Sequence, residues 1–233
     1  MSAPDDPLAR LAGERIAVVS VRAGFHAALD DLGSRLADAA ESVAESVVPV
    51  TAALLTDDER RLPAWWDRQD ALRVTCRRIE DDGFGLLARE SPVAGDLRQV
   101  VAIVRSSGHV HRSVELLGHV ARSSRWMDPT RLAPQLQALV HEIAEVSSKV
   151  FEGAADAWRE ADSLRAVDLD QADDAVDELQ RRLHDALVDG GCSTGEAVSL
   201  ALIARYLERI ADHGVALARE QTYAMTGERL DDS

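Results

Sequence analysis

The chain has 233 residues, of which 46% are hydrophobic, 29% are charged and only 4% are aromatic. This length allows one large domain or two domains of about a hundred residues, and the abundance of Ala, Leu, Arg and Glu favours helices over sheets. The formal net charge of −15 excludes a protein that binds nucleic acid through a broadly basic surface. We therefore expect an all-α protein that does not bind DNA directly.

The acidic residues are concentrated in the second half of the chain. Residues 131–233 hold 21 Asp and Glu but only 10 Lys and Arg. Cys76 and Cys192 are isolated, without the spacing of a disulfide framework or a zinc site. The N-terminus lacks a basic signal-peptide region, and no apolar run reaches the ~18 residues that a membrane helix needs. These features predict a cytoplasmic protein that is neither secreted nor membrane-spanning.

The first part of the chain predicts a flexible tail followed by a long helix. Residues 1–14 contain prolines and acidic residues, which indicates a loose N-terminal tail. From Phe25 to Leu54 apolar residues recur in steps of about three and four, which is typical of an amphipathic helix. Pro49 lies inside this pattern and should bend the helix without ending it.

Two shorter helices complete the first unit. The second should run from Trp65 to about residue 89, and Gly83 and Gly85 near its end predict fraying or an early stop. The third should begin at Ser91-Pro92, a capping residue followed by the proline favoured at the first helical position.

The same layout returns in the second half of the chain. An apolar stripe runs from Leu132 to Leu164, a second helix is expected over residues 171–188, and Ser193 to Glu196 has the spacing of a capping box. The sequence thus predicts two tandem three-helix bundles packed side by side, over residues 15–127 and 131–228.

Four acidic residues in the second unit form a candidate metal site. Asp173 and Asp177 are four residues apart on the second helix, and Glu208 and Asp212 have the same spacing on the third. Residues four apart share one face of a helix, so two adjacent helices could bring four carboxylates together, which suits hard cations. The alternative is solvated acids compensated by nearby arginines. Those arginines are Arg181, Arg182, Arg205 and Arg209.

Two segments resemble a known family. The segment Ala88 to Arg98, ARESPVAGDLR, is similar to the signature that opens the third helix of PhoU proteins, and Tyr206 to His213, YLERIADH, is similar to their repeated acidic motif. The resemblance covers about residues 20–228. It implies two three-helix repeats and binding of a divalent or trivalent metal (Mg, Mn, Fe or Zn) through acidic pairs that match Asp173, Asp177, Glu208 and Asp212.

The first repeat departs from this pattern. Where the resemblance places acids on the second helix, the chain has Gln69 and Arg73, and on the third helix it has His111 and Glu115. His111 and Glu115 keep the i,i+4 spacing and could act as partial ligands, but Arg73 would place a positive charge beside the cation. We expect no full metal cluster in this repeat.

The resemblance also implies a function. The chain would be a non-enzymatic, homodimeric, cytoplasmic regulator that connects the ATPase of a phosphate ABC transporter to a sensor histidine kinase, and it would restrain phosphate uptake and phosphate-starvation signalling. One alternative is a diverged, metal-free helical scaffold. Another, a di-metal oxidase bundle, is disfavoured because it needs Glu-x-x-His motifs and no histidine here has a glutamate three positions before it.

Overall fold

The computed structural model describes residues 7–56, 60, 62–123, 128–190 and 192–230, with side chains described from residue 22 onward. These residues form six α-helices and one short 3-10 helix, with no strand among them. The helices are α1 (Pro7–Leu55), α2 (Leu62–Glu90), α3 (Ala94–Arg122), α4 (Pro134–Glu160), α5 (Arg165–Val188) and α6 (Thr194–Thr226), with η3 (Pro129–Arg131) before α4. The predicted all-α fold with two three-helix units is confirmed.

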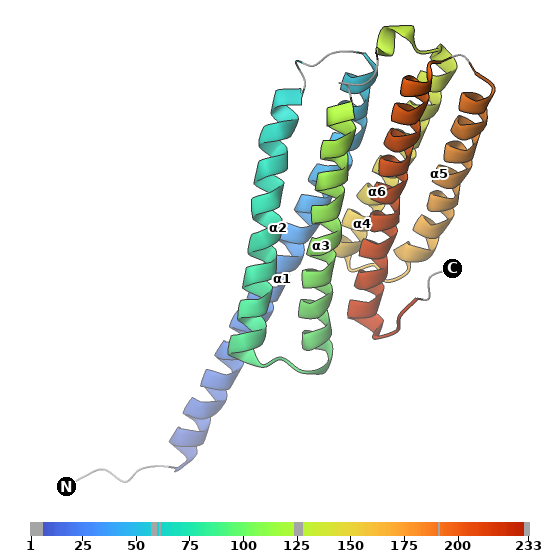
Figure 1. The fold of residues 1–233 in the computed structure, drawn as a ribbon. Helices are drawn as coiled ribbons and strands as arrows, with labels where there is room; N and C mark the ends of the chain where they lie inside the picture. The colour runs from blue at the N-terminus through green and yellow to red at the C-terminus, as the bar shows by residue number, and fades with distance from the viewer. Residues whose placement is uncertain (1–6, 57–59, 61, 124–127, 191, 231–233) are drawn as a thin grey trace.

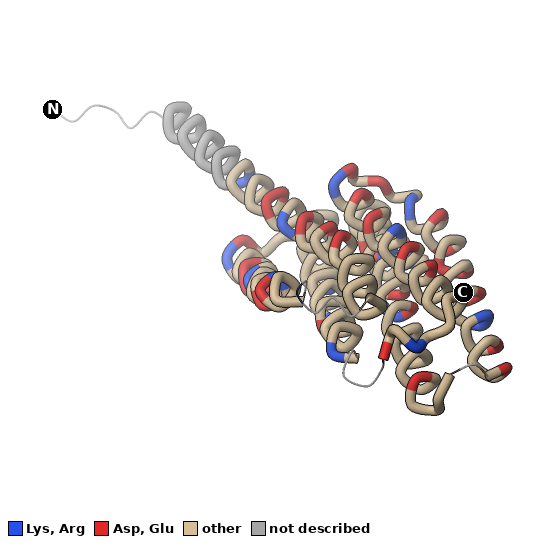
Figure 2. Tube along the Cα trace, turned by 90° about the horizontal axis from the view of Figure 1, so that it is seen from above, with Lys and Arg blue, Asp and Glu red and all other residues tan. Residues whose placement is uncertain are grey.

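The two units lie side by side, with α2 and α5 on the outside (Figure 1). Helix α1 packs against α4, and α3 packs against α6, so the four inner helices join the two repeats. Hydrogen bonds cross this junction as well: the Ser148 hydroxyl donates to the carbonyl oxygen of Ala44 at 2.8 Å. Acidic positions occur along every helix of the second unit, as expected from its charge (Figure 2).

One hydrophobic core runs through both repeats. Its fully buried side chains include Leu36 and Leu117 from the first repeat and Ile143 and Leu207 from the second, all within a single cluster of packed residues. Burial of apolar surface in such a cluster is the main stabilising contribution to a helical bundle. The repeats therefore stabilise one another.

Helix α1 differs in extent from the sequence-based expectation. It begins at Pro7, within the segment predicted as a flexible tail, and continues through Pro49 without ending there. Residues 1–6 of that tail and residues 124–127 at the expected end of the first unit lie outside the described part of the chain.

The expected fraying of α2 was wrong. The helix continues through Gly83 and Gly85 to Glu90. A Cβ atom at Gly83 would lie 2.6 Å from Cγ2 of Val104, so this glycine is needed because α2 and α3 approach closely there. The helix cost of glycine is about 1 kcal/mol, and packing between the helices outweighs it.

The two third helices begin in different ways. Helix α3 starts at Ala94 after Val93, which provides no side-chain cap, and Ser91 has a positive φ of 46°. The predicted start at Ser91-Pro92 was therefore wrong. Helix α6 begins with the predicted capping box, in which the Ser193 side chain accepts from the backbone N–H of Glu196 and the Glu196 side chain accepts from the backbone N–H of Ser193.

No helix in the described part of the chain is long and apolar enough to cross a membrane.

Candidate metal centre

The four candidate acids of the second repeat lie on the adjacent helices α5 and α6. Glu208 is buried, with only 7% of its surface exposed. Asp173 is half-buried, whereas Asp177 and Asp212 are exposed at the rim. The site thus has an inner pair of carboxylates and an outer pair that can move in solvent.

The carboxylates act on one another electrostatically. Burial, followed by the charge of Asp212, raises the pKa of Glu208 to about 7. Burial and the charges of Asp212 and Asp177 raise the pKa of Asp173 to about 6. The pKa of Asp212 is raised too, because the protein around its carboxylate desolvates it even though the residue as a whole is exposed. A cluster of this kind is stabilised by a bound proton or by a cation.

Two of the buried carboxylate oxygens have no hydrogen-bond partner. These atoms are Oδ1 of Asp173 and Oε2 of Glu208, one from each helix. Buried polar atoms are normally satisfied, and an unpartnered one costs about 1–3 kcal/mol. The unpartnered oxygens, together with the hard-oxygen donor set, fit a cation bound between α5 and α6.

The side chains are not arranged around an ion. In the part of the chain that the structure describes, no three His, Cys, Asp or Glu side chains are placed to hold a metal together. Glu208 instead accepts a hydrogen bond from the Arg205 guanidinium at 2.5 Å. Arg205 was among the arginines expected to compensate solvated acids, and here it partly neutralises Glu208. A cation would have to draw the exposed Asp177 and Asp212 inward.

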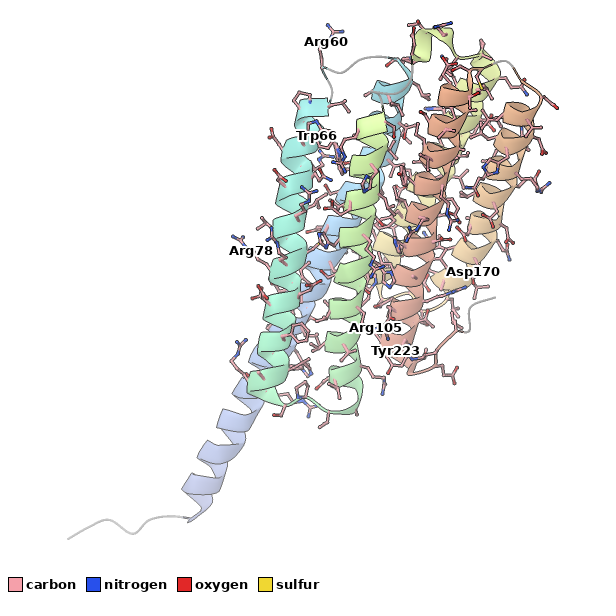
Figure 3. All side chains as sticks on the ribbon, viewed as in Figure 1. Arg60, Trp66, Arg78, Arg105, Asp170 and Tyr223 are labelled. Carbon is pink, nitrogen blue, oxygen red and sulfur yellow. The ribbon has the colours of Figure 1, made fainter. Side chains whose placement is uncertain are left out.

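One acidic residue of this region was not singled out from the sequence. Asp170, on the same helix as Asp173, is one of the charges that raise the pKa of Asp173, and its Oδ1 lies 3.0 Å from Arg219 of α6 (Figure 3). The spacing of Asp170, Asp173, Asp174 and Asp177 in steps of about three and four was the signal that could have identified it.

The corresponding region of the first repeat is closed by neutral and basic side chains. Gln69 is buried at 2% exposure and donates from Nε2 to the carbonyl oxygen of Val114 at 3.1 Å. It also lies over Gly118, where a Cβ atom would come within 2.2 Å of the Gln69 amide nitrogen. Gln69 therefore fills the space between α2 and α3.

Beside it, Arg73 binds Glu115 through two hydrogen bonds. The Nε–Oε1 distance is 2.5 Å and the NH2–Oε2 distance is 2.7 Å. Arg73 lowers the pKa of Glu115, so this carboxylate is charged and already paired. Nε2 of His111 lies 3.7 Å from Oε1 of the same carboxylate. The arginine occupies the carboxylate that a metal ion would need.

His213 follows Asp212 but faces the other repeat. Its Nδ1 lies 3.3 Å from Nδ1 of His109 on α3. Burial and the neighbouring His109 lower the pKa of His213 to about 4, so both rings are neutral near pH 7. The ring of His213 therefore lies against His109 at the junction of the repeats.

Comparison with known proteins places the chain in a family. Residues 140–220 match the PhoU domain model. The chain is 31% identical over 215 residues to phosphate-specific transport system accessory protein PhoU homolog 1 of Mycobacterium leprae, covering 91% of this chain and 97% of that protein. It is 30% identical over 210 residues to PhoU homolog 2 of Mycobacterium tuberculosis, covering 89% and 99%.

Two solved structures share the fold. PhoU from Pseudomonas aeruginosa has a TM-score of 0.80 at 25% identity and matches 88% of this chain and 100% of its own. The phosphate transport system regulatory protein PhoU from Streptococcus pneumoniae also has a TM-score of 0.80, at 21% identity over 89% of this chain and 99% of its own. The chain belongs to the PhoU family, whose members compared here are named as accessory or regulatory proteins of phosphate transport rather than as enzymes.

Proposed function

We propose that the chain is a cytoplasmic regulator of phosphate transport that holds a metal ion between α5 and α6 and acts by binding its partners. Asp173, Asp177, Glu208 and Asp212 would bind the ion, and Mg, Mn, Fe or Zn are the candidates. The ion would neutralise the mutual repulsion of the carboxylates and fix α5 against α6.

One observation carries the metal proposal. The half-buried Asp173 and the buried Glu208, on two different helices, both have raised pKa values, and each has one buried oxygen without a hydrogen-bond partner. An acidic patch that served only solubility would be solvated, and it would gain nothing from burying these two oxygens.

The proposed partners are inferred from the names of related proteins, and the long helices offer surface on which they could bind. Because related proteins are named as accessories of phosphate-specific transport systems, the ATPase subunit of a phosphate ABC transporter is the first partner. A sensor histidine kinase is the second, and the long helices offer surface for these contacts and for a homodimer. Binding to both would let the protein restrain uptake and phosphate-starvation signalling when phosphate is plentiful.

The metal proposal is tested by elemental analysis of protein purified without chelator. An Asp177→Ala, Glu208→Ala double variant should lose the bound metal. The matched control, Asp168→Ala with Asp185→Ala, removes two exposed acids from α5 and should retain it. Equal metal content in both variants would exclude this site.

The regulatory proposal has a separate test. Pull-down with the transporter ATPase and with the sensor region of the kinase should capture the protein, and light scattering should give the mass of a dimer. A deletion strain grown in ample phosphate should show raised alkaline phosphatase activity. Unchanged activity together with no capture would reject the adaptor role.

A second candidate, a metal-free scaffold, is favoured by one observation. At the positions where the resemblance places metal-binding acids, the first repeat has the Arg73–Glu115 ion pair and the buried Gln69, whose polar groups are satisfied by the protein itself. If elemental analysis finds no metal in the wild-type protein, the second repeat also folds without a bound cation, and the scaffold function is preferred.

A further inference from the structure

A basic cavity lies between α3 and α6, on the side of α6 that faces the first repeat. Its volume is about 380 Å³. Arg105, Arg219 and Arg229 line it together with His109, Glu220 and Tyr223. Arg105 of α3 and Tyr223 of α6 lie close together near the lower end of the bundle (Figure 3). Three guanidinium groups in one cavity are unexpected in a chain with a net charge of −15.

Arg105 and Arg229 keep hydrogen-bond donors available for a ligand, whereas Arg219 is paired with Asp170 of α5. Arg105 lies 3.1 Å from Oε1 of Glu220, and Arg229 stacks over the ring of Tyr223 at 4.6 Å from its centroid. A guanidinium has five N–H donors in a planar fork, so one ion pair leaves several donors unused. This geometry suits the oxygens of a phosphate group better than a lysine would.

Glu220 supplies the second observation. Glu220 is buried, with 9% of its surface exposed, and its Oε2 atom has no hydrogen-bond partner. Burial raises the pKa of Glu220 although Arg105 and Arg229 act against the shift. The negative charge of Glu220 is therefore easier to neutralise by a proton than that of an exposed glutamate, and its pairing with Arg105 reduces it further, so it opposes a bound anion less than a free carboxylate would.

We infer that this cavity binds a small, freely diffusing anion that carries a phosphate group, held by Arg105 and Arg229. Its volume falls within the range of small-molecule sites and admits more than a single inorganic ion. The inference goes beyond the proposed metal centre and uses different residues.

The test is isothermal titration calorimetry on the full chain after metal has been removed with chelator, so that a bound metal cannot hold the anion. The titrants are inorganic phosphate and pyrophosphate. One of them should bind at one site per chain, and Arg229→Ala should weaken binding about tenfold or more, the value of a hydrogen bond to a charged group. Arg105→Ala should do the same, but it also leaves Glu220 unpaired, so the exposed Arg229 is the decisive position.

The matched control is Arg78→Ala, which removes an exposed arginine on the outer side of α2, away from the cavity (Figure 3). It should bind as the wild type does. No heat with either titrant, or equal weakening by Arg78→Ala and Arg229→Ala, overturns the inference. So does binding that occurs only to vesicles containing an anionic phospholipid, because the source would then be a lipid headgroup.

The inference and the metal proposal fail separately. An Asp173→Asn, Glu208→Gln variant should lose metal and keep anion binding. The Arg229→Ala variant should keep metal and bind the anion about tenfold or more weakly. If Arg229→Ala retains anion binding while metal content is normal, only the cavity assignment is rejected.

Discussion

The two repeats differ in the side chains that lie between their second and third helices. In the first, Arg73 pairs with Glu115 and Gln69 fills the space between the helices. In the second, Asp173 and Glu208 are buried without full compensation, and Arg205 satisfies only one oxygen of Glu208. The first repeat has stability from its own side chains, whereas the second keeps an energetic cost that a ligand can remove. The two copies of the repeat therefore differ in how far their own side chains satisfy the polar groups between the second and third helices.

The largest effect is expected from making the first repeat resemble the second. Gln69→Asp with Arg73→Asp places carboxylates at two positions of α2, one of them almost fully buried. We expect the metal-free protein to lose about 3 kcal/mol or more of stability, because the new carboxylate at position 69 is buried without a partner and Glu115 loses Arg73. Added metal should restore part of this loss and raise the metal content per chain. Unfolding by denaturant with and without metal, alongside the exposed control Arg77→Asp, measures both.

The next effect concerns the pH dependence of the second repeat. Glu208 has its pKa raised in the fold from 4.5 to about 7, so the folded state binds its proton more tightly than the unfolded state. Its contribution to the stability of the metal-free protein is full below pH 4.5 and is lost as the pH rises to about 7.

Glu208→Gln has no carboxyl group to titrate at this position, so the variant should not show the loss of stability between pH 4.5 and about 7. At pH 7 the variant should be more stable than wild type in chelator by about 2–3 kcal/mol, the value of the shift before discounting its coupling to Asp212. Because His213 has a lowered pKa and acts in the opposite direction over the same range, the difference between variant and wild type is the quantity to follow. Parallel pH curves for the two proteins would contradict the assignment of this shift to Glu208.

A smaller effect of the opposite sign is expected in the first repeat. Arg73→Met leaves the carboxylate of Glu115 without its two hydrogen bonds. Since both side chains are about one-third exposed, the loss should be only about 1 kcal/mol. A double-mutant cycle with Glu115→Gln measures the coupling. A stabilised Arg73→Met protein would show that the two repeats do not differ in the way described.

The smallest expected change in stability concerns the N-terminal caps of α3 and α6, the third helices of the two repeats. Ser193→Ala removes the capping box of α6 and should cost about 1 kcal/mol. Ser91→Ala should change stability little, because no side chain caps α3. Thermal unfolding of both variants provides the comparison, and equal losses would contradict it.

Much of the fold was predictable from local signals. The apolar stripes of α1 and α4, the capping box at Ser193 and the duplicated layout all depend on spacing along the chain, and the structure confirms them. The errors came where contacts between distant residues decide the outcome. Gly83 was expected to make the end of α2 fray, but its missing side chain leaves the space that Val104 of α3 occupies. Ser91-Pro92 has the composition of a helix start, yet α3 begins at Ala94.

The sequence could name four candidate acids, but it could not give their geometry. The three-helix layout predicted that Asp173 and Glu208 lie on adjacent helices, which the structure confirms, but it could not show which oxygens are buried or that Arg205 contacts Glu208. The contact of His213 with His109 and the basic cavity depend on how α3 meets α6. Sequence periodicity within one repeat carries no information about that junction.

The continuous core through the inner helices has a consequence for how the molecule can be divided. Because α1 packs on α4 and α3 on α6, a fragment ending after the first repeat would leave its broad apolar flank facing water. Such a fragment should aggregate or pair with another fragment instead of persisting as an independent module. Melting of the intact chain should accordingly be a single all-or-none event, so that neither half can be lost without the other.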